Sequence, residues 1–402
     1  MEGASIESLY RTSDRLVHAV SMNFHRYLYD KIRWNARLIA IKGARGVGKT
    51  TLLLQHIKEN FGENSQLALY VSLDNMWFAT HTLSEVVEYH YTHGGTHLFI
   101  DEVHKYKDWQ TVIKNINDEY PDMHVVYTSS SMLKMESEKG DLSRRQIMYQ
   151  LNGLSFREYM AFEGAVATEC VSLQDLLRRH TKIALQITSQ CKVLPLFERY
   201  LKVGFYPFYK RDSEEFEQRL QSVIRTILYE DLPAVEDVSY PTVQKVQRML
   251  MILAAKVPQT PNMSELYSHL ETNREQGMKM LDLLEKGSLL NLLSSEKKSF
   301  RYLSKPDKIY LNNTNLMYAL TPMANVGTLR ETFFLNQLTA VAKVCYPPQG
   351  DFFVDNKYLF EVGGGSKSFE QIKDLNDSYL AVAGIEIGYG HRIPLWMFGL
   401  LY

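Results

Sequence analysis

The sequence contains few cysteines, almost no net charge and no long hydrophobic run. Only 3 of its 402 residues are cysteines, and Cys170, Cys191 and Cys345 are too far apart for a zinc site and odd in number for a disulfide set. We therefore expect reduced cysteines that serve in packing. The 45 Lys plus Arg nearly balance the 46 Asp plus Glu, so any basic patch that attracts nucleic acid must be local.

All hydrophobic runs are shorter than a bilayer span requires, and the first residues, MEGASIESLYRTSDRL, lack the apolar core of a signal peptide. We predict a soluble, cytoplasmic protein with no membrane partner. The chain is 45% hydrophobic and 23% charged, which is typical of globular proteins. Its length allows roughly two to four domains.

Short apolar runs alternate with amphipathic stretches in the first part of the chain. The helix-like stretches lie at 51–59, 83–91 and 108–120. We interpret the apolar runs as 5 strands, namely LIAI from Leu38, LALYVSL from Leu67, HLFI from His97, HVVYTS from His124 and QIMYQL from Gln146. This alternation predicts an α/β domain with a parallel sheet and helices on both faces, at residues 1–154.

A glycine-rich motif follows the first of these strands. GARGVGKT, residues 43–50, has the pattern GxxxxGK[ST] between an apolar strand and a helix, which is the context of a phosphate-binding loop. Glycines let backbone N–H groups converge on phosphate oxygens, and the helix directs its positive end to the same anion. Lys49 would act on the β and γ phosphates, and Thr50 would bind Mg²⁺. The predicted ATP-binding residues are Gly43, Ala44, Arg45, Gly46, Val47, Gly48, Lys49, Thr50 and Thr51.

The strand HLFI is followed directly by two carboxylates, Asp101 and Glu102. Side chains alternate along a strand, so we expect the two to point different ways. Asp101 would hold the magnesium shell, and Glu102 would polarise the attacking water. Together with the glycine-rich loop, this pair predicts a Mg-dependent ATPase; the alternative is an acidic pair that merely ends a strand.

Hydroxyl and guanidinium groups further along are candidates for the same site. The strand HVVYTS leads into Thr128, Ser129 and Ser130, which could contact the γ-phosphate, although hydroxyls after a strand are also typical of turns and caps. Arg144 and Arg145 could stabilise transition-state charge in their own subunit or in a neighbour, or form structural salt bridges. A role in a neighbour would require self-association.

Three further regions are predicted after the α/β domain. Residues 155–239 have a helical pattern and are interpreted as a helical lid. Residues 240–312 have the order of a winged helix-turn-helix, in which Thr272 caps the second helix, Glu275 completes a capping box and Gly287 stops that helix. Residues 313–402 read as a small α/β domain with helices at 330–344 and 368–377 and a strand pair at 351–362.

GARGVGKTTLL, FIDEVHKYKDW, GDLSRR and LNGLSFREYM together resemble the bacterial and archaeal AAA-type ATPases that carry an uncharacterised nuclease-like domain at the C-terminus. The resemblance covers nearly the whole chain. It implies an additional-strand P-loop core, a helical segment, a winged helix and a domain similar to the PD-(D/E)xK nucleases.

The nuclease-like pattern is only partly present. Glu331, Asp351 and Glu361 match the carboxylate positions, but Gly363 stands where the resemblance implies a lysine. The nearest candidates to replace it are Lys367, after the glycine run, and Lys373, on the next predicted helix. We therefore favour a degenerate scaffold or a protein-binding module over an active nuclease.

The winged-helix region carries 11 Lys plus Arg against 7 acids between Tyr240 and Tyr310, a modest excess of +4. DNA binding by this region and a role as a lid or interface are about equally favoured. The residues placed to contact DNA are Asn273, Arg274 and Lys279 on the recognition helix and Lys297, Lys298 and Arg301 on the wing.

These observations predict an ATPase with ATP and Mg²⁺ as cofactors, in which the nucleotide state repositions the winged-helix and C-terminal domains. DNA or a protein partner would be the cargo. A slow nucleotide-dependent interaction switch with no DNA role is the first alternative. An ATP-regulated, metal-dependent nuclease is the second.

Overall fold

The computed structural model describes residues 5–63, 65–129, 142, 144–211, 214–236, 238–256, 262–296, 305–321, 324–367, 369–370, 372 and 375–402. The chain divides into two compact units. Unit 1 consists of Met1–Asn152 and Glu230–Asp237, and unit 2 of Gly153–Tyr229 and Val238–Tyr402. No helix of the described residues is both long enough and apolar enough to span a bilayer.

Unit 1 is built on a 5-stranded sheet in the order β2-β3-β4-β1-β5, and all of its pairings are parallel. The predicted strands and the parallel sheet are confirmed. β4 lies between β1 and β3, and β5 closes the edge beside β1. The strands are β1 (Leu38–Lys42), β2 (Ala68–Ser72), β3 (His97–Asp101), β4 (His124–Ser129) and β5 (Ile147–Gln150).

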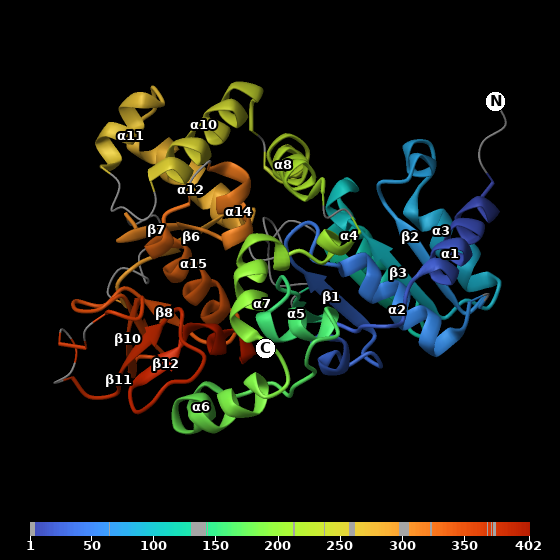
Figure 1. The fold of residues 1–402 in the computed structure, drawn as a ribbon. Coiled ribbons are helices and arrows are strands. Elements are labelled where there is room, and N and C mark those ends of the chain that lie inside the picture. Colours follow the sequence, from blue (N-terminus) through green and yellow to red (C-terminus); the bar gives the residue numbers. More distant parts are fainter. Residues whose placement is uncertain are drawn as a thin grey trace. The chain divides into compact units, whose positions relative to one another are not determined.

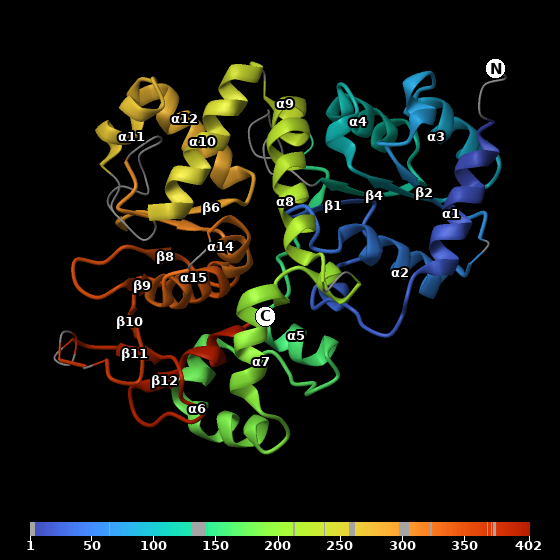
Figure 2. The ribbon, with the colours of Figure 1, turned by 45° about the horizontal axis from the view of Figure 1, so that its top comes forward.

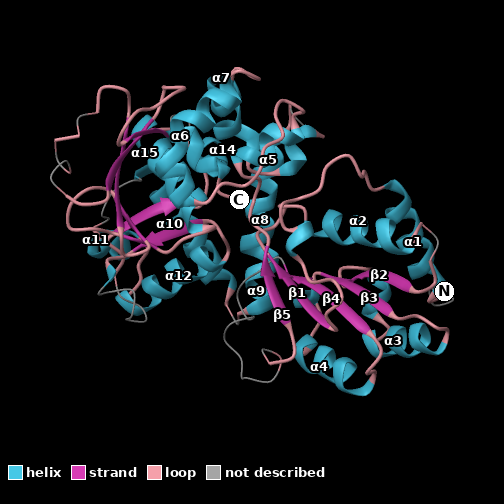
Figure 3. Ribbon diagram, turned by 90° about the horizontal axis from the view of Figure 1, so that it is seen from below, coloured by secondary structure: helices cyan, strands magenta, loops and turns pink. Residues whose placement is uncertain are grey.

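Helices cover both faces of this sheet, as Figure 3 shows for α2 on one face and α3 and α4 on the other. α1 packs against β2 and α2. The short α9 belongs to unit 1 although it follows unit 2 residues in the chain. The helices are α1 (Glu7–Ala19), α2 (Lys49–Phe61), α3 (Leu83–Thr92), α4 (Trp109–Glu119) and α9 (Leu232–Val235), with 3-10 turns η1 (Tyr29–Lys31), η2 (Met76–Ala79) and η3 (Val103–Lys105).

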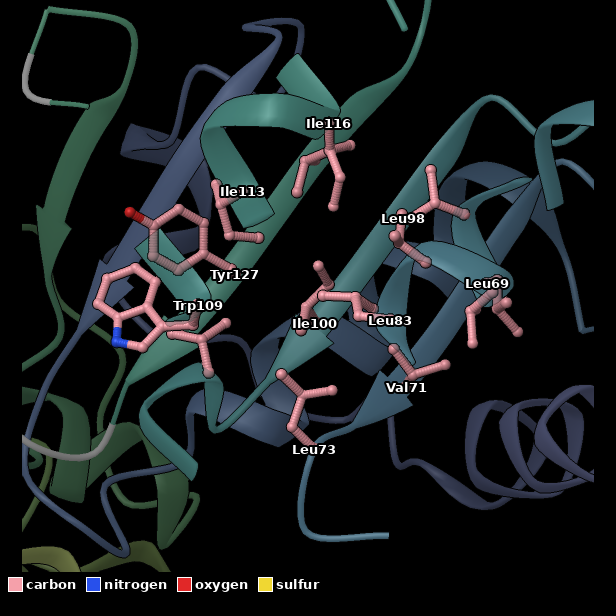
Figure 4. Packing of buried hydrophobic residues seen from close by; sticks show 14 of the residues in the cluster. Leu69, Val71, Leu73, Leu83, Leu98, Ile100, Trp109, Ile113, Ile116 and Tyr127 are labelled. Atoms are coloured by element: carbon pink, nitrogen blue, oxygen red, sulfur yellow. The ribbon is translucent and has the colours of Figure 1, made fainter. Parts of the chain in front are cut away.

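The core between the sheet and α3 and α4 follows from strand alternation. Alternate residues of β3, Leu98 and Ile100, point to this face and are completely buried. In Figure 4 they pack with Leu83 of α3 and with Ile113 and Ile116 of α4. The strands are buried on both faces and therefore read as continuous apolar runs in the sequence. This packing fixes the carboxyl ends of β1, β3 and β4, where the candidate site lies.

Unit 2 begins with helices and ends with a mixed sheet (Figure 1). The first helical part contains α5 (Phe156–Phe162), α6 (Leu173–Thr188), α7 (Val193–Arg199), η4 (Tyr200–Gly204), η5 (Pro207–Lys210) and α8 (Phe216–Thr226). α10 (Tyr240–Lys256), α11 (Met263–His269) and α12 (Arg274–Lys286) follow, and then an antiparallel pair formed by β6 (Leu290–Leu293) and β7 (Lys308–Leu311).

The last part of unit 2 is a 5-stranded sheet in the order β12-β11-β10-β9-β8, visible in Figure 2. β10 pairs in parallel with β11 and antiparallel with β9, and α15 packs on β10. The elements are α14 (Thr314–Leu320), α15 (Val326–Thr339), β8 (Val344–Cys345), β9 (Phe352–Val354), β10 (Tyr358–Gly363), β11 (Ser378–Val382), β12 (Arg392–Pro394) and η7 (Leu395–Leu400).

Two local predictions in unit 2 are wrong. The N-cap of α12 is Asn273, whose side chain accepts a hydrogen bond from the Gln276 N–H at 2.9 Å, and not Thr272. Asn caps a helix at least as well as Thr does, so two adjacent candidates could not be ranked by type alone. The described residues of the expected helix at 368–377 form turns and bends. Gly287 does lie at the C-cap of α12.

Candidate nucleotide site and carboxylate cluster

The glycine-rich loop connects β1 to α2. Gly46 and Gly48 have φ angles of 85° and 99°, in the left-handed region that other residues rarely adopt. Gly43 has no room for a side chain, because a Cβ there would lie 2.3 Å from the carbonyl oxygen of Leu151. These glycines are therefore required by the path of the loop itself.

Lys49, the first residue of α2, lies under this loop and is buried. Its Nζ donates to the carbonyl oxygens of Gly43 and Ala44, at 2.9 and 3.0 Å. Burial lowers the pKa of Lys49 below its ordinary value, although the charges of Glu102 and Asp101 act in the opposite direction. The Lys49 amine is thus held at the loop by neutral carbonyl oxygens.

Asp101, the last residue of β3, accepts three hydroxyl hydrogen bonds and is 3% exposed. Thr50 Oγ1 donates to its Oδ2 at 2.6 Å, and Tyr70 OH donates to the same oxygen at 2.9 Å. Thr128 Oγ1 donates to Oδ1. Thr50 and Asp101, the two predicted magnesium ligands, therefore lie in direct contact at the carboxyl edge of the sheet. Tyr70 was not expected here.

Glu102 lies beyond the strand, not within it. Its φ of 58° places its backbone in the left-handed region. The alternation of side chains along a strand, on which the prediction for Asp101 and Glu102 is based, therefore does not set the direction of the Glu102 side chain. The backbone N–H of Glu102 donates to Thr128 Oγ1 at 3.1 Å. A non-glycine residue held at positive φ is strained and is common at functional sites. The carboxylate lies 3.5 Å from Arg45 Nη2 and 3.5 Å from His104 Nε2.

Asp231, which the sequence reading missed, completes this cluster of charges. Arg45 donates to it from Nε at 3.0 Å and from Nη2 at 2.9 Å, and Lys105 Nζ lies 3.5 Å away. Asp231 is 2% exposed. Burial alone would raise its pKa, but hydrogen bonds from His104 and Arg45 hold the pKa well below its ordinary value. The carboxylate is therefore ionised.

Glu102, His104 and Asp231 each offer a ligand atom within 4.8 Å of the others, which is a spacing that suits a metal ion. Arg45 and Lys105 already contribute positive charge beside these atoms. A bound cation would meet repulsion from both groups.

Arg26 is a second residue that the sequence reading missed. Its buried guanidinium donates to the carbonyl oxygen of Val47 in the loop, and to that of Asn152 at 2.7 Å. Arg26 therefore joins the glycine-rich loop to the segment that follows β5. A single arginine far upstream of the motif carries no local signal for this role.

Of the three hydroxyl residues predicted to contact the γ-phosphate, the structure describes the two at the end of β4. Thr128 contacts both acidic residues, as described above, and Ser129 Oγ lies 3.3 Å from His104 Nδ1. Ser130 lies outside the described residues.

Arg144 and Arg145 precede β5 at the amino end of the strands, whereas the loop follows the carboxyl end of β1. Arg145 pairs with Asp118 of α4 at 2.9 Å. It precedes β5, whose Ile147 is level with Ile39 of β1. The carboxyl end of β5, at Gln150, is level with the end of β1 that leads into the loop. Arg145 lies five residues before Gln150, which corresponds to about 16 Å of extended chain. Roles of Arg144 and Arg145 in their own subunit or in a neighbouring one both stay predictions.

Unit 2 contains a separate cluster of carboxylates and lysines. Lys308 Nζ, on β7, lies 3.4 Å from Glu331 of α15 and 3.5 Å from Asp351. Asp351 Oδ2 accepts the Val362 N–H at 2.9 Å, beside Glu361 on β10. Burial, followed by the charge of Asp351, raises the pKa of Glu331. The three carboxylates expected from the resemblance are therefore neighbours.

Lys367 reaches this cluster across Gly363. Its Nζ lies 2.7 Å from Glu361 Oε1, and a Cβ on Gly363 would lie 2.6 Å from the Lys367 stem. Residues 361 and 363 point to the same face of β10, so the Lys367 stem fills the space that a side chain at 363 would take. Glu361 is 2% exposed, and its Oε2 has no hydrogen-bond partner among the described residues.

The predicted DNA contacts are only partly described. Arg274 and Lys279 are exposed on α12, and Asn273 is exposed with its side chain used in capping. Lys297, Lys298 and Arg301 lie outside the described residues.

Comparison with known proteins gives two family matches. Residues 35–160 match an AAA domain, and residues 194–326 match a domain of unknown function, DUF8612. An uncharacterised protein of Methanocaldococcus jannaschii, MJ1637, is 27% identical over 384 residues, which are 87% of this chain and 80% of that protein. Neither family match supports the nuclease-like resemblance of the C-terminal part.

Several solved structures are similar at low identity. C. elegans PCH-2 is 18% identical with a TM-score of 0.22, over 44% of this chain and 48% of that one. AMPPCP-bound DnaA from Aquifex aeolicus is 14% identical with a TM-score of 0.26, over 71% and 91%. A DNA replication initiation factor is 13% identical with a TM-score of 0.25, over 70% and 96%. These TM-scores are too low to carry an argument.

The family match and the fold agree on this part of the chain. Residues 35–160 are similar to an AAA domain, and they contain the parallel sheet and the glycine-rich loop.

Proposed function

We propose that this chain binds Mg-ATP through residues 43–51 and hydrolyses it with Glu102 as the general base. The observation that carries the proposal is the meeting of three residues beside the loop. Thr50 Oγ1 lies 2.6 Å from Asp101 Oδ2, and Glu102 follows Asp101 in a left-handed turn. The AAA match supports nucleotide chemistry at this site.

The residues of the loop suit a triphosphate. The turns at Gly46 and Gly48 precede the start of α2, where backbone N–H groups would be directed to a bound phosphate. Lys49 would exchange two carbonyl acceptors for phosphate oxygens, which accept stronger, charge-assisted hydrogen bonds. Thr50 and Asp101 offer the oxygen ligands that Mg²⁺ prefers. When bound, Mg²⁺ would neutralise charge on the β and γ phosphates.

Glu102 is positioned to orient the attacking water. Its backbone is held by Thr128, which also donates to Asp101, so the two carboxylates have a fixed relation. Its carboxylate lies at 3.5 Å from both Arg45 and His104, which are longer contacts than close hydrogen bonds. It therefore keeps capacity to accept a proton from water.

The experiment is steady-state ATP hydrolysis by the purified full chain, with and without Mg²⁺. Glu102→Gln should lower the rate at least about a hundredfold while ATP still binds, since a positioned general base contributes about 10²–10⁴-fold. Glu119→Gln, on an exposed residue at the end of α4, is the matched control and should hydrolyse ATP at the wild-type rate. An unchanged rate in Glu102→Gln would exclude Glu102 as the base, and no ATP binding by the wild type would exclude the site.

We further propose that residues 155–239 form a helical lid, residues 240–312 a winged helix and residues 313–402 a nuclease-like domain. The winged helix is supported by the order α10, α11, α12 and the antiparallel pair β6 and β7. Exposed Arg274 and Lys279 on α12 would contact phosphates.

Hydrolysis measured with duplex and with single-stranded DNA tests this assignment. A rate that rises with DNA supports DNA as the cargo. A rate indifferent to DNA favours a protein cargo, and tight binding with very slow turnover favours the nucleotide-dependent switch.

A second candidate function is metal-dependent cleavage of a nucleic-acid backbone in unit 2. The observation that favours it is the contact between Lys367 and Glu361, because Lys367 supplies the lysine that is missing at position 363. The other carboxylate oxygen of Glu361 has no hydrogen-bond partner among the described residues. Glu331, Asp351 and Glu361 would supply the oxygen ligands for a divalent cation. Lys308, between Glu331 and Asp351, would compete with that cation.

Calorimetric titration of the full chain with Mn²⁺, and incubation with a plasmid, test this second function. Glu361→Gln should abolish both the Mn²⁺ binding and the cleavage assigned to unit 2, and Glu102→Gln should leave that cleavage intact in the absence of ATP. Wild-type protein that binds Mn²⁺ at unit 2 but leaves the plasmid intact would indicate a degenerate scaffold.

A further inference from the structure

The arginine of the glycine-rich loop is held by a residue from a distant part of the chain. Arg45 binds Asp231 through both Nε and Nη2, at 3.0 and 2.9 Å. Such a two-point contact is the strong form of an arginine–carboxylate pair. His104 and Lys105 each lie 3.5 Å from the same carboxylate. Asp231 is thus attached to the rest of unit 1 through Arg45, with His104 and Lys105 beside it.

The segment that carries Asp231 connects parts of unit 2. Glu230–Asp237 belongs to unit 1, whereas Tyr229 and Val238 on either side belong to unit 2. Asp231 ends a π-helical turn, η6 (Ile227–Asp231), that continues α8 into α9. π-helical turns are rare in proteins, and those that do occur are often found at functional sites. We call residues 230–237 the strap.

Arg45 also stands on the side of the site where the γ-phosphate is expected. Its Nη2 lies 3.5 Å from Glu102, the residue proposed to orient water toward that phosphate. A guanidinium binds carboxylate and phosphate with the same planar geometry. The γ-phosphate would bring further negative charge to a place where Asp231 and Glu102 already share one arginine.

We propose that the γ-phosphate of ATP and Asp231 compete for Arg45, so that ATP weakens the attachment of the strap to unit 1. This inference rests on the proposed ATP site. ADP lacks the competing group and should leave the strap in place. His104 and Lys105 remain close to Asp231, so ATP loosens the strap without freeing it. Because α8 precedes the strap and α10 follows it in the chain, a change in the strap would act on both of these helices of unit 2.

Competition has a thermodynamic consequence that can be measured. If ATP weakens the Arg45–Asp231 contact, that contact must weaken ATP binding by the same factor, and such couplings are typically about 5–150-fold. Asp231→Asn keeps the shape of the side chain and removes its charge. It should therefore strengthen binding of a non-hydrolysable ATP analogue at least about fivefold and change ADP binding much less.

The experiment is calorimetric titration of the full chain with that analogue and with ADP. The variants are Asp231→Asn, Arg45→Gln and the double variant, with Glu230→Gln as the control, because exposed Glu230 contacts Lys105 and not Arg45. In the Arg45→Gln background, Asp231→Asn should have no further effect on the ratio of the two affinities. Unchanged or weaker analogue binding in Asp231→Asn overturns the competition, as does a gain that persists without Arg45.

Amide hydrogen exchange on the wild-type chain tests the strap directly and needs no variant. Peptides that cover residues 230–236 should exchange faster with the ATP analogue than with ADP. Equal or slower exchange overturns the inference while leaving the ATP site intact. Failure of the wild type to bind either nucleotide would instead remove the ATP site, and the inference with it.

Discussion

Tyr70→Phe is expected to destabilise unit 1 because it removes one of three hydroxyl donors to a buried carboxylate. The Tyr70 OH donates to Asp101 Oδ2 at 2.9 Å, and Asp101 is 3% exposed. Burial and the negative charge of Asp101 raise the pKa of Tyr70, so the hydroxyl stays protonated and remains a donor. Phe has nearly the same shape, so the substitution changes the hydrogen bond and leaves the packing intact.

The expected magnitude follows from the charge of the acceptor. A hydrogen bond to a charged group contributes about 1.5–3 kcal/mol, compared with about 0.5–1.5 kcal/mol for a neutral pair. Thr50 and Thr128 still donate to Asp101, which favours the lower part of the range. The free energy of unfolding of unit 1 should fall by about 1.5–2 kcal/mol, which is about 10–30-fold in the equilibrium constant.

The assay is native-state amide exchange on peptides from β2 and β3, because a chain with two units need not melt in a single transition. Tyr149→Phe is the matched control. Tyr149 OH accepts the Arg33 backbone N–H at 2.9 Å at an exposed site, so its loss should cost less than about 1 kcal/mol. Equal exchange rates in the two variants would refute the view that Asp101 depends on buried hydroxyl donors.

Three further outcomes are expected. Arg26→Met leaves the Val47 carbonyl without this donor, and ATP affinity by calorimetry should fall about tenfold, as one lost hydrogen bond to a charged group implies; unchanged affinity would contradict loop support. Lys367→Met removes the positive partner of buried Glu361 and leaves that carboxylate without it, so the melting temperature should fall below that of the wild type; an unchanged melting temperature would contradict this. Burial, followed by the charge of His97, lowers the pKa of His56 from 6.5 to about 4. The unfolded chain therefore takes up the proton first, so stability is complete above about pH 6.5 and decreases by up to about 3 kcal/mol as the pH falls to 4, which urea unfolding would detect and His56→Gln should remove.

The features of unit 1 that the sequence predicts are those with strong local signals. A strand buried on both faces reads as a continuous apolar run, and LIAI and HVVYTS became β1 and β4 for that reason. The loop is equally local, because its shape depends on glycines at fixed spacing, two of which adopt positive φ. Neither inference requires knowledge of which distant residues pack together.

The parts of the site that the sequence does not reveal come from distant segments. Asp231 reaches Arg45 across 186 positions, and Arg26 reaches the Asn152 carbonyl across 126. Neither lies in a pattern that marks it, since each acts through a contact formed only in the folded chain. Lys367 was partly predictable. The sequence indicates it as a replacement for the missing lysine, but the packing of its side chain against Gly363 is known only from the fold.

The position of Asp231 is unfavourable for a site that binds an anion, and this is an argument for its role. A triphosphate gains affinity from every cation directed at it, and an aspartate that occupies the loop arginine with two contacts reduces that gain. Stability alone does not require the aspartate, since replacing a buried ion pair by apolar residues is often neutral or favourable. An aspartate that lowers ATP affinity is instead expected where ATP has to displace it, because the affinity lost on binding is the free energy that moves the strap.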